Sequence, residues 1–104
     1  MQTLGIQKLR IPYSFDLELS GQLYNFSCNY NSKENFFTVD LALDGETIAA
    51  GEKIILGQPL FAAHVDSRLP SEVLLPLAPA DDAQRVGFRE LGESVFVFIL
   101  GGDV

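Results

Sequence analysis

Apolar and polar residues alternate along much of the N-terminal half of the chain, as they do in a β-strand with one buried face. In the run 36–43 every second side chain is apolar, at Phe37, Val39, Leu41 and Leu43. Asp44-Gly45 follows this run and favours a two-residue turn, because Gly accepts φ > 0 without steric cost and Asp tolerates it. We therefore predict a hairpin in which the run 47–56 returns beside the first strand, with a bulge or bend at Gly51.

An earlier pair of runs predicts a second hairpin. Phe15, Leu17 and Leu19 alternate with polar residues, and after Ser20-Gly21 the run 23–30 alternates as well. The second run has the apolar face Tyr24, Phe26, Cys28 and Tyr30. Residues 1–8 are predicted to form an N-terminal arm or a short edge strand, because a glycine interrupts them.

The C-terminal half contains shorter and less regular runs. Residues 73–75 precede Pro76 and predict a short edge strand, because proline cannot donate a hydrogen bond to a further neighbour. Residues 79–84 predict one helical turn, since Asp is a good N-cap. The continuous apolar run 95–100 predicts a strand buried on both faces, either in the middle of the sheet system or against another subunit.

These runs together predict an all-β fold with little helix. The expected architecture is a small antiparallel β-sandwich or a partly open β-barrel, built from sequential hairpins. A chain of 104 residues, 47% of them hydrophobic, is long enough for one core and short for two. We therefore expect a single β-rich domain over residues 1–104.

The composition argues against several kinds of partner. Seven Lys and Arg residues against fourteen Asp and Glu residues give a net charge of −7, which repels a phosphate backbone, so sequence-specific binding of nucleic acid is not expected. A membrane-spanning helix needs about twenty apolar residues, far more than the run 95–100 offers, and no secretion signal is recognisable. The single cysteine, Cys28, suits folding in a reducing cytoplasm.

No group of residues predicts catalysis. His64 is the only histidine, and no nearby Ser or Cys completes a known motif, so a packing or surface role is favoured. Cys28 falls on the predicted core face, where a thiol is a poor nucleophile. Asp16, Glu18 and Asp40 could form a glycosidase-like pair, but a solvated acidic sheet face explains them more simply. Because no spacing typical of a metal site occurs, we expect neither an enzyme nor a cofactor or metal.

Several short segments of the chain resemble, in their order and spacing, the phage baseplate plug family. They span nearly the whole chain and are Ile11-Pro12-Tyr13, Tyr30-Asn31, residues 37–41, Asp44-Gly45, residues 48–51 and Leu91-Gly92. The chain departs from the family at the start of its third strand, where Phe36-Phe37 stands in place of a pair resembling Phe-Trp.

The resemblance implies a structural subunit in the tail baseplate of a contractile-tailed bacteriophage, a plug-like component near the hub and the end of the tail tube. Its expected partners are hub, tail-tube or wedge subunits, in a homo-oligomeric ring or a hetero-complex. Its expected location is the virion, after synthesis in the cytoplasm of the host bacterium. The acidic surface is compatible with a position along the channel through which DNA passes.

Six apolar residues are candidates for contact with such a partner. Phe96 and Phe98 point to one face of the last strand, and the other four lie in irregular segments, at Ile54, Ile55, Leu60 and Phe61. The alternative function is a small ligand- or carbohydrate-binding β-module without catalysis. Such a module is expected to expose aromatic side chains on a polar sheet face, and the only tyrosines available are Tyr13, Tyr24 and Tyr30.

Overall fold

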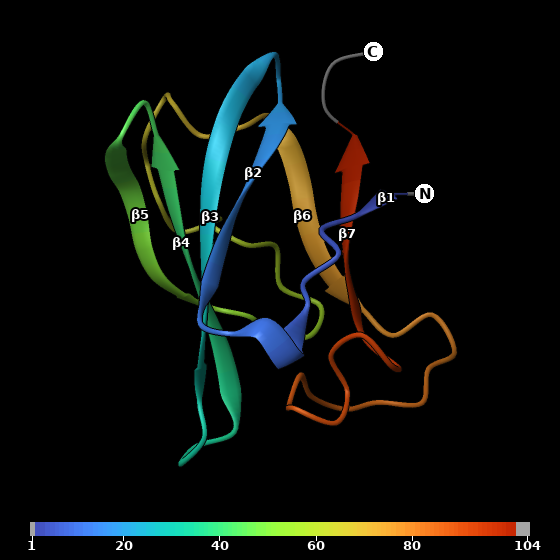
Figure 1. Cartoon of the computed structure of the whole chain (residues 1–104). Helices are drawn as coiled ribbons and strands as arrows, with labels where there is room; N and C mark the ends of the chain where they lie inside the picture. The colour runs from blue at the N-terminus through green and yellow to red at the C-terminus, as the bar shows by residue number, and fades with distance from the viewer. Residues whose placement is uncertain (1, 102–104) are drawn as a thin grey trace.

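Two antiparallel sheets face each other in the computed structural model, which describes residues 2–101 (Figure 1). One sheet has the order β2-β3-β4-β5, with β2 (Tyr13–Leu19), β3 (Gln22–Asn31), β4 (Phe36–Leu43) and β5 (Glu46–Lys53). The other has the order β1-β7-β6, with β1 (Gln2–Thr3), β7 (Phe96–Gly101) and β6 (Glu72–Leu77). A short 3-10 helix, η1 (Lys8–Arg10), precedes β2. The all-β prediction is confirmed.

Both predicted hairpin turns are present in the four-stranded sheet. Ser20 and Gly21 have φ of 53° and 76°, and Asp44 and Gly45 have φ of 52° and 79°. Positive φ at both central residues defines a type I′ turn, whose twist matches that of the flanking strands. These local turns bring β2, β3, β4 and β5 together in sequential order.

Gly51 forms the predicted bulge. Val39 pairs with Glu52 whereas Leu41 pairs with Ala49, so two residues of β5 face Asp40. Gly51 has a φ of 68°, and its N–H donates to Asp40 Oδ1 at 2.7 Å. The bulge shifts the register of β5, which pairs with β4 on both sides of it.

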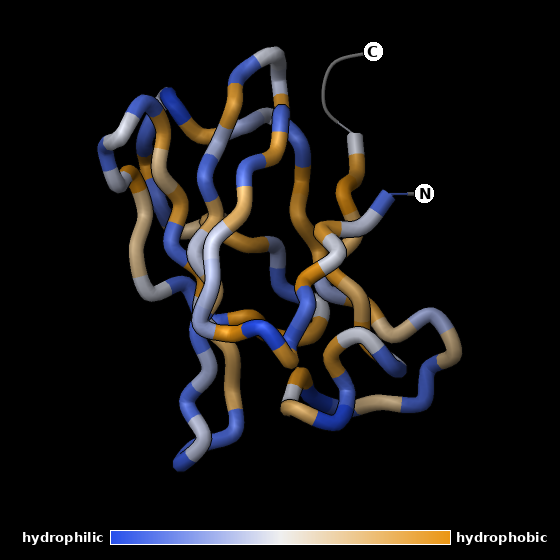
Figure 2. Tube along the Cα trace, viewed as in Figure 1, coloured by the Kyte–Doolittle hydropathy of each residue, from blue (hydrophilic) through white to orange (hydrophobic). Residues whose placement is uncertain are grey.

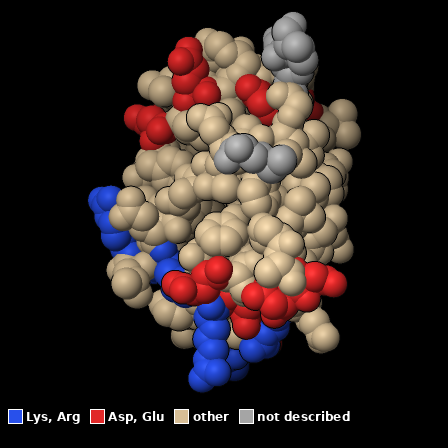
Figure 3. Space-filling view, turned by 90° about the vertical axis from the view of Figure 1, so that its right-hand side faces the viewer, with Lys and Arg blue, Asp and Glu red and all other residues tan. Residues whose placement is uncertain are grey.

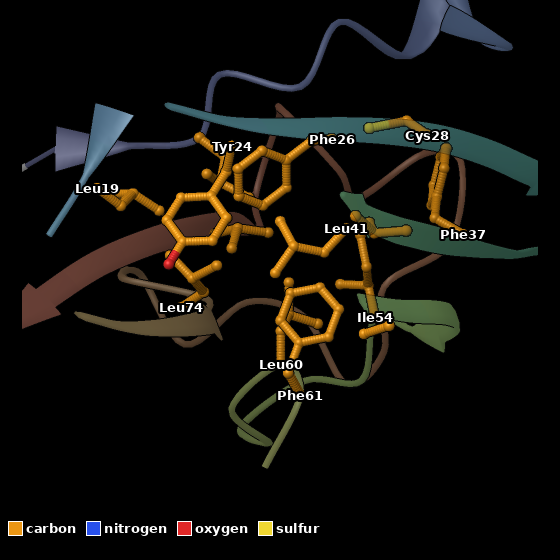
Figure 4. Close-up of a cluster of buried hydrophobic side chains, with 14 of the residues drawn as sticks. Leu19, Tyr24, Phe26, Cys28, Phe37, Leu41, Ile54, Leu60, Phe61 and Leu74 are labelled. Atoms are coloured by element: carbon orange, nitrogen blue, oxygen red, sulfur yellow. The ribbon is translucent and has the colours of Figure 1, made fainter. Parts of the chain in front are cut away.

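The core lies between the two sheets and takes the inward face of each strand (Figure 4). Alternate residues of β3 and β4 point into it, so the apolar faces predicted for these strands are confirmed. The three-stranded sheet contributes Leu74 from β6 and Val97 from β7, both almost fully buried. Leu4, next to β1, is also buried and donates its N–H to Val97 O at 2.9 Å, so the N-terminal segment forms the short edge strand that was one of its two predicted states.

The helical turn predicted for residues 79–84 is not formed. Asp81 has a φ of 55°, outside the helical region, and its N–H closes a turn onto Ala78 O at 2.9 Å. The residue expected to cap a helix instead takes the left-handed conformation that Asp tolerates in turns.

A polar clasp joins one edge of the four-stranded sheet to the three-stranded sheet. The Ser20 N–H donates to Glu72 Oε2 at 2.9 Å, and the Ser20 hydroxyl bonds both Glu72 and Ser71. Desolvation acts to raise the pKa of Glu72, but the hydrogen bonds from Ser20 outweigh it and leave the pKa below its ordinary value. The clasp therefore favours the charged carboxylate.

Candidate interaction surface

The outer face of the three-stranded sheet is apolar along both of its longer strands. The cross-strand pairs on this face are Val73 with Leu100, Leu75 with Phe98, and Leu77 with Phe96. Residues between them, such as Leu74 and Val97, point into the core, whereas the six outward side chains are not part of the core cluster. Val73 is 41% exposed and the other five are half-buried. We call these six residues the apolar ladder.

The hydropathy pattern separates this sheet from its neighbour. In Figure 2 the colours alternate along β2, β3 and β4, whereas β6 and β7 are mostly orange. A strand that is apolar on both faces is typical of a position where both faces are covered. In the three-stranded sheet the inner face is covered by the core, and the outer residues of β6 and β7 lie outside that core.

A shallow hollow of about 240 Å³ lies beside the apolar ladder. Thr3, Gly5 and Ile6 from the N-terminal segment line one side, and Leu91 and Gly92 from the loop before β7 line the other. Phe96 borders this hollow and also belongs to the ladder. The ladder and the hollow therefore form one continuous surface feature.

Charged side chains gather at the rim of this side of the molecule. Figure 3 looks onto the side where β1 and β7 lie, and Lys, Arg, Asp and Glu appear at its top, left and bottom while its middle is tan wherever grey atoms do not cover it. An uncharged centre with a charged rim agrees with the anatomy of protein–protein interfaces, whose cores are depleted of charged residues.

Three of the six predicted contact residues lie instead in the chain's own core. Ile54, Leu60 and Phe61 are 2%, 6% and 5% exposed, which leaves a partner almost nothing to touch. The segment that carries them closes the sandwich on one side, since Ile54 N–H donates to Phe37 O at 3.0 Å and Leu60 N–H to Leu74 O at 2.8 Å. These three residues were expected at the surface because their segment has no strand periodicity.

The other three predicted contact residues are accessible. Ile55 is 37% exposed, and Phe96 and Phe98 share the outer face of β7, as expected from their spacing. The prediction missed the β6 half of the ladder. Val73, Leu75 and Leu77 recur at every second position, but only the register with β7 shows that they extend the surface of Phe96 and Phe98.

The residues considered for catalysis have structural contacts. His64 Nε2 lies 3.4 Å from Glu52 Oε1, and the same carboxylate accepts the Phe61 N–H at 2.8 Å. Cys28 is 2% exposed, and burial, with a smaller contribution from the charge of Asp40, raises the pKa of its thiol to about 11. Among residues 2–101, no three His, Cys, Asp or Glu side chains cluster as metal ligands.

A family model described as cyanophage baseplate Pam3 plug gp18 matches residues 1–102 of the chain. The match covers every described strand of both sheets. The chain belongs to this baseplate plug family. No curated protein matches it.

Membership of the baseplate plug family makes the protein a structural component of the phage tail baseplate, located in the virion tail and associated with other baseplate components. The resemblance seen in the sequence is thereby confirmed. Within the described range, no helix has the length and hydrophobicity needed to cross a bilayer.

The tyrosines of this plug-family chain face away from its polar sheet surface. Tyr24 is buried, and its hydroxyl donates to Arg68 O. The Tyr13 hydroxyl accepts the Gln7 N–H at 2.8 Å, and the Tyr30 hydroxyl donates to Asn35 Oδ1 at 2.6 Å. None of the three tyrosines stands on the outer face of the four-stranded sheet, where a carbohydrate-binding module would be expected to present them.

Proposed function

We propose that the protein is a plug-like subunit at the hub and tail-tube end of the baseplate, and that it acts through protein–protein contacts made by the apolar ladder. The ladder is the observation that supports this role. Six apolar side chains on one sheet face, without a charged residue among them, are an association hazard unless a neighbouring subunit covers them. The occupant in this proposal is another baseplate protein of the hub or tail tube.

The role we infer is structural and non-catalytic, without a cofactor. Support comes from the raised pKa of Cys28 and from the pairing of His64 with Glu52, which commit these two groups to the fold. The net charge of −7 opposes binding to a phosphate backbone. A lone reduced cysteine also suits synthesis in the host cytoplasm before assembly.

Two charged substitutions test the ladder. Phe96→Asp and Phe98→Asp each place a carboxylate where the partner would desolvate it, so binding to the hub and tail-tube proteins of the same phage should fall by at least about tenfold. Leu23→Asp is the matched control, since Leu23 is 61% exposed on the outer face of the other sheet. Circular dichroism reports folding, a pull-down reports the complex, and light scattering of the isolated chain reports self-association.

Each outcome of this test has a distinct meaning. Folded variants that fail to bind the hub and tail-tube proteins support the apolar ladder as the contact surface. If the variants instead lose self-association, the partner of the apolar ladder is a second copy of the chain. Unfolding of both variants would show that this face belongs to the chain's own core. Normal binding by both would place the contact elsewhere.

A further inference from the structure

Strand β2 provides a regular open edge in the described part of the chain. The outer edge of β6 is covered, because Gly57 N–H and Leu60 N–H donate to Pro76 O and Leu74 O, both at 2.8 Å. The opposite edge of the four-stranded sheet is β5, whose pairing is interrupted by register shifts. The remaining edge of the three-stranded sheet is β1, which is only two residues long. In contrast, β2 pairs with β3 without interruption from Tyr13–Leu19.

The hydrogen-bonding pattern between β2 and β3 shows which backbone groups of β2 lie at its open edge. Leu19 and Gln22 close a two-residue turn and are therefore a hydrogen-bonded pair, so Leu17 and Phe15 also direct their N–H and C=O toward β3. A contact from Asn25 Nδ2 to Phe15 O at 3.5 Å agrees with this pattern. The N–H and C=O groups of Ser14, Asp16 and Glu18 point the other way, and no backbone hydrogen bond from residues 2–101 reaches them.

The side chains along this edge differ between its two faces. Asp16 and Glu18 are exposed on the outer face, whereas Phe15 and Leu17 point inward but are only half-buried. An added strand would place every second side chain opposite the carboxylates and the alternate ones over the apolar pair. The edge thus specifies both the backbone geometry and the side-chain pattern of what pairs with it.

We propose that an extended segment of another baseplate protein adds to β2 as a fifth strand of the four-stranded sheet. The segment has about five residues, with Lys or Arg opposite Asp16 and Glu18 and apolar residues that cover Phe15 and Leu17. A second copy of this chain does not fit, because β2 paired antiparallel with itself would bring Asp16 and Glu18 close to their own counterparts. Only the nature of the partner rests on the proposed function, since the edge is separate from the apolar ladder.

A synthetic peptide tests the edge directly. The probe is a capped peptide of alternating Lys and Val, and its control has the same residues in two blocks, which keeps the charge and removes the alternation. Binding is measured by calorimetry at physiological salt so that non-specific attraction is screened. Hydrogen exchange of the complex should show new protection at the amides of Ser14, Asp16 and Glu18 with the alternating peptide only.

Charge reversal then tests the side-chain pattern. The double variant Asp16→Lys with Glu18→Lys should bind the Lys-Val peptide about tenfold more weakly and gain binding to a Glu-Val peptide. The control double variant, Glu34→Lys with Asp82→Lys, has the same net charge at exposed positions away from β2 and should lose much less affinity. Thermal melting of all variants verifies that they fold.

Three results would overturn the proposal. These are no binding of the alternating peptide, protection at other strands in place of β2, or equal loss of affinity in both double variants. None of them bears on Phe96 and Phe98, so failure at the β2 edge and failure of the apolar ladder can be told apart.

Discussion

The outer faces of the two sheets follow the same period of two but carry opposite chemistry. On the four-stranded sheet the outward positions of β2 and β3 hold residues such as Asp16, Glu18, Asn25 and Ser27. On the three-stranded sheet every outward position of the β6–β7 ladder is apolar. Water can solvate the polar side chains of the first face, whereas the apolar side chains of the second face are stabilised by contact with another apolar surface. The two sheets thus share one core but divide the surface into a solvated side and a side suited to contact.

Alanine substitutions of inner and outer apolar residues should differ most in their effect on the free energy of unfolding. Phe26→Ala removes a side chain with 0% exposure and should lower the free energy of unfolding by about 3–5 kcal/mol. Phe98→Ala, on the half-buried outer face, should cost roughly 1 kcal/mol or less in the isolated chain. Urea denaturation of both variants measures this contrast. Equal costs would mean that the outer face is structural and that the comparison of the two sheets fails.

The four-stranded sheet is built from tight hairpins, and a turn substitution tests that dependence. Gly45 has a φ of 79°, which a β-branched residue adopts only with strain, so Gly45→Val should cost on the order of 1–3 kcal/mol. Asp44→Asn is the matched control, because Asn also tolerates the positive φ of that position. Thermal unfolding measures both. A Val variant that melts with the wild type would contradict the type I′ assignment.

The clasp between the sheets gives the smallest expected effect and depends on pH. The pKa of Glu72 is lower in the folded chain than in the unfolded one, so its charged form stabilises the fold above the unfolded pKa of about 4.3. This contribution is lost as the pH falls through the folded value. Glu72→Gln should therefore melt below the wild type at pH 7, by a small margin because solvent screens the site.

The pH dependence provides the control for the clasp. The difference in melting temperature between the wild type and Glu72→Gln should shrink as the solution is acidified below pH 4. A difference that stays constant between pH 7 and pH 3 would show that packing, and not the charge of Glu72, accounts for it.

Local signals predicted the four-stranded sheet well. Its turns at Ser20-Gly21 and Asp44-Gly45 and the bulge at Gly51 depend on the φ preferences of single residues, which the sequence displays directly. The three-stranded sheet depends on contacts between distant segments. β1 and β7 meet from opposite ends of the chain, so neither their pairing nor the register of β6 could be read from periodicity.

The candidate surface was predicted in part for the same reason. The outward pair Phe96 and Phe98 follows from strand spacing, but whether Leu60 and Phe61 are covered depends on how an irregular segment folds over the sheets. Asp81 shows a similar limit, because Asp suits both a helix N-cap and a left-handed turn. The choice between those states is made by the surrounding chain and not by the residue.

The position of Cys28 bears on how long the particle can persist outside its host. A virion leaves the reducing cell and meets dissolved oxygen, where an exposed thiolate would oxidise or link neighbouring subunits by a disulfide. With 2% exposure and a pKa near 11, Cys28 stays a neutral thiol shielded by Phe37 and the inner sheet faces. We therefore expect oxidation and disulfide formation at this single thiol to be slow in the virion.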